Sequence, residues 1–167
     1  AFLAHASEGL NQAVHSVEWR PGDNAVFAIA RFPVTNLEYT QFLRATGALP
    51  PPWWTDPRFS GGDQPVVGIS WLDAEAFCQW LSRERGEACR LPSEAEWEKA
   101  ARGGLDGARY PWGDERPAGA SFDRPPPVTT TPANPLGLHA LSGVCHEWCL
   151  DWESETYYRM SPERNPR

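Results

Sequence analysis

The stretch of residues 90–104 carries start and stop signals for one helix, and these constrain the fold more than any other local feature. Ser93 and Glu96 form a capping-box pattern, in which each side chain accepts a hydrogen bond from the other residue's backbone amide. Gly103 readily takes the left-handed conformation that ends a helix. We therefore expect a helix that begins after Ser93 and ends before Gly103.

The side chains on one face of this helix differ greatly in size. Trp97, Ala100 and Ala101 are spaced i, i+3 and i+4, which places them together on the helix surface. The small alanines beside the large indole leave room for a neighbouring backbone to come close. The pattern predicts a helix packed tightly against a sheet.

Two further helices are indicated by similar end signals. Thr35 or Asn36 caps a helix that ends near Gly47, and a second capping box at Ser70 opens a helix that ends at Gly86. Strands are expected where apolar residues alternate or run together. The expected strands are residues 13–19, 25–32 and 145–152.

The composition indicates one soluble, loop-rich domain over residues 1–167. Seventeen prolines, fourteen glycines and nine tryptophans favour long loops held by buried aromatic rings. Residues 105–132 lack periodicity and should form a surface loop over the sheet. A net charge of −7 argues against nucleic acid as a partner, and no apolar run approaches the ~20 residues of a membrane span. We favour the cytoplasm over secretion.

The four cysteines lack the paired spacing of a zinc site. If residues 145–152 form a strand, Cys145 and Cys149 lie ~13 Å apart, too far for a disulfide. His146 would then point to the opposite face of the strand. Buried thiols beside a structural Glu147 are therefore favoured over a shared metal site. The pairing of Cys78 and Cys89 stays open.

Six motifs that follow one another along the chain resemble the formylglycine-generating enzyme family, also called sulfatase-modifying factors. The resemblance implies an α+β fold: a variant of the C-type lectin fold with a twisted antiparallel sheet, two to three helices and long irregular loops. The motifs are residues 32–39, 65–78, 90–104, 110–114, 134–138 and 143–152.

The resemblance also implies metal sites from which this chain departs. Family members hold a structural calcium ion partly through asparagines, but the matching positions here are Ser121 and Val144, which leaves Asp123 and Glu147 as oxygen ligands. The copper-binding cysteine pair of the family's oxidases follows a Gly-Gly-Ser motif in a C-terminal segment. We expect that segment to begin beyond Arg167, so that the domain is incomplete at its C-terminus.

Three functions are compatible with these features. The first is a domain that binds a protein or small ligand without catalysis, as in the variable proteins of retroelements that share the family fold. The second is the ordered part of a copper-dependent oxidase that converts a sulfatase cysteine to formylglycine. The third is a docking module of a larger protein. We favour the first because no catalytic group is recognisable. Its candidate ligand contacts are Trp53, Trp54, Trp112 and Trp152, for which core packing is the alternative role.

Overall fold

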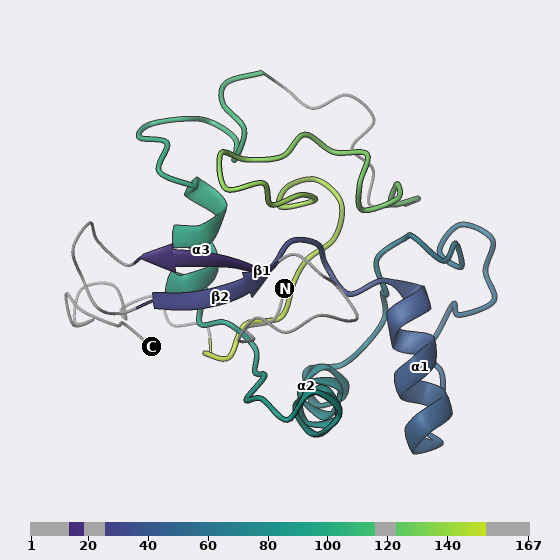
Figure 1. The fold of residues 1–167 in the computed structure, drawn as a ribbon. Helices are drawn as coiled ribbons and strands as arrows, with labels where there is room; N and C mark the ends of the chain where they lie inside the picture. Colours follow the sequence, from purple (N-terminus) through teal and green to yellow (C-terminus); the bar gives the residue numbers. More distant parts are fainter. Residues whose placement is uncertain (1–13, 19–25, 116–122, 153–167) are drawn as a thin grey trace.

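The fold combines a short antiparallel sheet with three helices, as an α+β fold requires (Figure 1). The computed structural model describes residues 14–18, 26–115 and 123–152. Strands β1 and β2 pair antiparallel, with Val14 opposite Ala30 and Glu18 opposite Val26. The elements in chain order are β1 (Val14–Glu18), β2 (Val26–Ala30), α1 (Asn36–Thr46), α2 (Trp71–Arg85) and α3 (Glu94–Arg102).

All three helices begin and end where the sequence signals predict. Each N-terminus has a complete capping box, which satisfies amide groups that would otherwise lack a partner. Each C-terminus passes into a glycine with left-handed backbone angles. The N-caps are Thr35, Ser70 and Ser93, and the glycines are Gly47, Gly86 and Gly103.

Helix α3 packs closely on the strand hairpin, as its alanine face predicts (Figure 1). Ala100 and Ala101 share a buried cluster with Ile29 of β2. Behind them, the buried side chain of Asn134 donates to the carbonyls of Ala100 and Ala101, at 2.7 and 3.1 Å. A Cβ on Gly103 would come within 2.9 Å of that same amide. This side of the molecule has no room for larger side chains.

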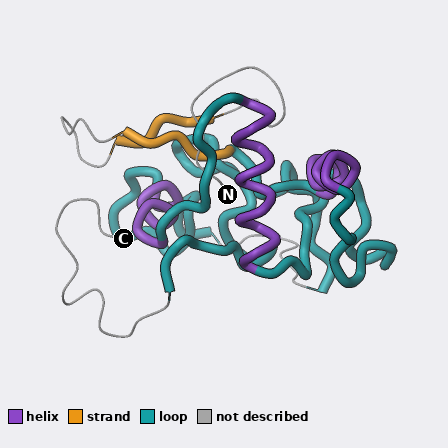
Figure 2. The backbone as a smooth tube through the Cα atoms, turned by 90° about the horizontal axis from the view of Figure 1, so that it is seen from below, coloured by secondary structure: helices purple, strands orange, loops and turns teal. Residues whose placement is uncertain are grey.

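Helix α2 lies between α3 and α1 and runs across their axes (Figure 2). Its contact with α1 is aromatic: Tyr39 and Phe42 of α1 meet Phe77 of α2 with ring centroids 5.7 Å apart in both pairs. Trp80 extends the cluster, 5.4 Å from Phe77. Such ring pairs stabilise a core beyond the area that they bury. Within the described ranges, no helix has the length and apolar character needed to cross a membrane.

The expected strand over residues 145–152 is not formed. The segment is extended, but its backbone bonds to groups other than a neighbouring strand. The Trp71 indole donates to the Cys149 carbonyl at 2.8 Å, and the Leu150 amide donates to the Pro92 carbonyl at 2.8 Å. These bonds take the place of a strand ladder and fasten the segment across the N-terminal ends of α2 and α3.

The loop expected over residues 105–132 is present in its described parts, 105–115 and 123–132. Its second part packs on a neighbouring loop: the Val128 amide donates to the Asp63 carbonyl at 2.9 Å, and the Gln64 side chain donates to the Pro125 carbonyl at 2.6 Å. Val128 and Pro125 are buried as a result.

Candidate functional site

An apolar cavity of about 540 Å³ lies beside α2. Its volume falls in the ~300–1,000 Å³ range typical of small-molecule sites. Residues from α1, α2 and four loop segments form its walls. The deepest of these side chains are buried: Tyr39, Val66, Ala74, Phe77, Leu91 and Val144.

Two partly exposed tryptophans line the cavity, and adjacent residues hold both of them. Trp53 is 57% exposed and Trp148 is 48% exposed. The Trp148 indole donates to the Ile69 carbonyl at 3.0 Å. The Trp53 ring lies on Gly68, where a Cβ would come within 3.1 Å of the indole. Residues 68 and 69 therefore set the positions of both indoles.

Trp53 and Gly68 both have a positive backbone φ angle. Trp53 has a φ of 64°, a left-handed conformation that costs free energy in a residue with a side chain. Gly68 has a φ of 74°, which glycine adopts without strain. Glycine at position 68 thus allows both the turn and the close approach of the indole.

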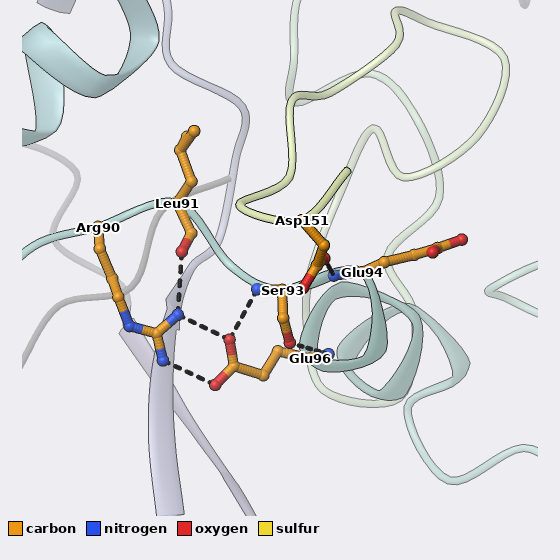
Figure 3. A network of polar contacts seen from close by, with 6 residues as sticks. All are labelled: Arg90, Leu91, Ser93, Glu94, Glu96 and Asp151. Atoms are coloured by element: carbon orange, nitrogen blue, oxygen red, sulfur yellow. Dashed lines mark hydrogen bonds and ion pairs between the residues drawn. The ribbon is translucent and has the colours of Figure 1, made fainter. Parts of the chain in front are cut away.

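The segment that carries Trp148 is anchored at the start of α3 (Figure 3). The carboxylate of Asp151 accepts a hydrogen bond from the Glu94 amide, one of the free amides at the positive end of the helix dipole. Close by, the Arg90 guanidinium forms two 2.8 Å bonds with the Glu96 carboxylate. Together with the Leu150 amide bond, these contacts hold residues 145–148 against the cavity.

The electrostatics of the anchor keep Glu96 ionised. Burial alone would raise the pKa of Glu96, but hydrogen bonds from the Arg90 guanidinium and the Ser93 amide bring it below its usual value. The capping box of α3 is therefore charged near neutral pH.

The cysteines are free thiols, and their surroundings keep them protonated. Cys78 and Cys145 line the cavity, and burial raises the pKa of each to about 12. Burial also raises the pKa of Cys149 to about 11 and that of Cys89 above its usual value. Because the thiolate is the nucleophile, a raised pKa makes each of these thiols less reactive near neutral pH.

The residues considered for calcium lie in different surroundings. Val144 is 1% exposed and packs with Val128 and Ala140 in an apolar cluster. Asp123 is exposed, whereas Glu147 lines the cavity. Among the side chains that the structure describes, no three His, Cys, Asp or Glu residues are grouped to hold a metal ion. Ser121 lies outside the described residues.

The four candidate tryptophans occupy different surroundings. Trp53 lines the cavity; the other three do not. Trp54 is half-buried, with its ring 6.1 Å from Tyr39. Trp112 stacks on the Tyr110 ring at 5.6 Å, and Trp152 is 92% exposed.

Trp148 lines the cavity but was not among the predicted ligand contacts. The predicted strand also placed His146 on the opposite face from Cys145 and Glu147, yet all four residues from Cys145 to Trp148 line the cavity. Consecutive residues can share a surface here because the segment is not a strand. One signal in the sequence could have indicated this. Trp148 directly follows the polar residues His146 and Glu147, and such polar neighbours are unusual in a strand of the core.

Comparison with known families matches residues 6–165 to the family described as "Sulfatase-modifying factor enzyme 1-like domain". The chain is 33% identical to a formylglycine-generating enzyme of Streptomyces coelicolor, over 92% of this chain and 65% of the relative. It is also 33% identical to the serine/threonine-protein kinase pkn1 of Chlamydia caviae, over 80% of this chain but 24% of the relative. The chain thus spans less than two thirds of either relative.

A solved structure, that of Treponema denticola variable protein 1, shares the fold with a TM-score of 0.59. The match covers 92% of this chain and 73% of that one, at 19% sequence identity. The likeness extends over nearly the whole chain at the level of the fold.

Proposed function

Because the chain belongs to the family of sulfatase-modifying factor enzyme 1-like domains, whose fold is an α+β variant of the C-type lectin fold, we propose that it is a ligand-binding domain of that family. The ligand enters the cavity between Trp53 and Trp148, and the domain binds it without chemistry. The observation that carries this proposal is the apolar cavity of about 540 Å³ with two indoles fixed at its wall.

The state of the thiols supports binding over catalysis. Cysteine chemistry needs a thiolate, which requires a lowered pKa from a nearby cation, a helix N-terminus or a metal. Burial instead raises the pKa of both cavity thiols, Cys78 and Cys145, to about 12. Inert, protonated thiols behave as small apolar groups and suit the wall of a binding cavity.

The test is a fluorescence titration with N-phenyl-1-naphthylamine, a neutral dye that becomes brighter in apolar surroundings. We expect saturable binding, and about tenfold weaker binding for Trp53→Gly and for Trp148→Ala, which corresponds to about 1.4 kcal/mol. Trp is enriched among the contact residues whose truncation costs more than about 1 kcal/mol. Glycine at position 53 accepts the positive φ, so this variant should fold.

The control variants are Trp112→Ala and Trp152→Ala, which each remove an indole outside the cavity. Both should bind the dye like the wild type. If all four variants bind equally, or if the wild type does not bind, the cavity is not the site.

A second candidate function is supported by one relative. The formylglycine-generating enzyme of Streptomyces coelicolor matches 92% of this chain at 33% identity, so this chain is also a candidate part of such an oxidase. Among the described residues, none of the four cysteines belongs to a group of three or more His, Cys, Asp or Glu side chains that could hold a metal ion. The test is incubation with copper, oxygen and a Cys-x-Pro-x-Arg peptide, followed by trapping of the aldehyde. Aldehyde formation would replace the binding proposal with this one.

A further inference from the structure

The cavity's side chains have a charge pattern that selects among ligands, and this inference rests on the proposed binding function. Five of the lining residues are Phe, Tyr or Trp: Tyr39, Trp53, Phe59, Phe77 and Trp148. No Lys or Arg is found among the described residues that line the cavity, where the one carboxylate is Glu147 and the one imidazole is His146. An anionic ligand would lose its hydration and meet neither an ammonium nor a guanidinium group in return.

Negative charge extends beyond the cavity wall. After burial, the Glu147 carboxylate is the next contribution that raises the pKa of the Cys145 thiol. At Cys149, burial is again the largest cause of the raised pKa, and Glu147, Asp151 and Glu94 all add to it. At Tyr39, another lining residue, Asp73 adds to the effect of burial in raising the pKa to about 12. Carboxylates from α2 and from residues 145–152 therefore act on lining residues of the cavity.

Arg58 lies beside Phe59, one of the lining residues, and is itself paired with a carboxylate. The Arg58 guanidinium lies 5.0 Å from the Phe59 ring centroid, a cation–π contact. It is also bonded to Asp56, with Nη2 2.8 Å from Oδ2 and Nε 3.1 Å from Oδ1. Its charge is thus compensated by a carboxylate on the same loop.

We propose that the cavity binds an organic cation with an apolar body, of the arylalkylammonium class. The faces of aromatic rings attract a cation through the ring quadrupole. A ring carries no net charge, so this attraction does not require a carboxylate to be desolvated, as a buried ion pair would. The apolar body suits the aliphatic and thiol walls around Val66, Ala74 and Cys78. A carboxylate at the Glu147 position adds attraction for the same charge.

The experiment displaces bound N-phenyl-1-naphthylamine with three probes of similar size and different charge. They are benzyltrimethylammonium, its neutral isostere neopentylbenzene, and the anion 3-phenylpropionate. We expect the cation to displace the dye at about tenfold lower concentration than the neutral isostere, with little displacement by the anion. Equal or tighter binding of the isostere or of the anion would overturn the inference.

Two variants locate the source of the preference. Glu147→Gln should weaken displacement by benzyltrimethylammonium about fivefold and leave neopentylbenzene unchanged, whereas the matched control Glu84→Gln, an exposed position outside the cavity, should change neither. Trp148→Leu keeps an apolar side chain but removes a ring, so it should reduce the preference for the cation. A preference that persists in both variants would contradict this origin.

The outcomes separate this inference from the proposed function. If the dye does not bind the wild type, the binding function fails and this inference fails with it. If the dye binds in the cavity but the cation gains nothing over its neutral isostere, the binding function stands and only the ligand class is wrong.

Discussion

Two regions of the molecule differ in how completely they are filled. In the cluster that α3 shares with β2, Ala100 and Ile29 are fully buried and the Asn134 amide bonds the end of α3. Beside α2, Ala74 and Phe77 line a cavity of about 540 Å³. Protein interiors are normally packed as densely as organic crystals. This contrast is the physical basis of our proposal that the cavity takes a ligand.

The largest expected effect concerns the thiols at the cavity. Burial raises the pKa of Cys78 and Cys145 to about 12, against about 9 in the unfolded chain. At pH 8 the thiolate fraction, and with it the rate of iodoacetamide labelling, should be about 1,000-fold lower in the native protein. Site-resolved mass spectrometry in buffer and in urea measures this ratio. Native labelling within about tenfold of the unfolded rate would mean that the cavity is open to water.

The same pKa shifts predict a loss of stability at alkaline pH. Between pH 9 and 12 the unfolded chain releases its thiol protons while the native protein keeps them, so the unfolded state binds fewer protons. The free energy of unfolding should therefore fall as pH rises through this window. Replacing Cys78 and Cys145 by Ala or Val should remove part of that dependence. An unchanged pH profile in the double variant would contradict this assignment.

The next prediction concerns the bonds that hold the end of α3. Asn134→Leu removes two hydrogen bonds to the carbonyls of Ala100 and Ala101 and two from the amides of Leu136 and Leu138. Because these groups are buried, we expect a loss of about 3 kcal/mol in the free energy of unfolding, measured with urea. Gln41→Ala, at an exposed position on α1, should stay within about 0.5 kcal/mol.

The most direct comparison makes the same substitution, Ala to Leu, in the α3 cluster and at the cavity. Ala100→Leu adds volume where Ile29 is already in contact, and should cost about 2 kcal/mol. Ala74→Leu adds the same volume toward the cavity, and should cost less than about 0.5 kcal/mol or stabilise the protein. Urea denaturation of both variants decides. Equal costs would mean that the two regions are filled alike.

A small net effect on stability is expected at Trp53. Trp53→Gly relieves a left-handed conformation but loses the indole contact with Gly68 and the Phe59 ring, whose centroid is 6.0 Å away. These contributions oppose each other, so the free energy of unfolding should change by less than about 1 kcal/mol. A larger loss would make Trp53 a core residue and weaken its assignment to the binding site.

What could be predicted from the sequence is what local signals encode. The three helices begin at Thr35, Ser70 and Ser93 because side chains one turn apart complete each capping box. The contact of α3 with the sheet follows from the helical spacing of Trp97, Ala100 and Ala101, which places them on one face. These features depend on residues a few positions apart.

The cavity depends on contacts between residues far apart in the chain. The Trp71 indole bonds the Cys149 carbonyl, and the Trp148 indole bonds the Ile69 carbonyl, across 78 and 79 positions. No local pattern reports such bonds, so the alternation in residues 145–152 predicted a strand that is not there. For the same reason Trp148 was missed, while Trp112 and Trp152 were selected on residue type alone.

The most direct test of a ligand site at the cavity is the affinity of N-phenyl-1-naphthylamine for the wild type and for Ala74→Leu. We expect the wild type to bind the dye saturably and one to one. Ala74→Leu should bind the dye at least about tenfold more weakly while it keeps its free energy of unfolding. Equal affinity of the two proteins for the dye would contradict this prediction.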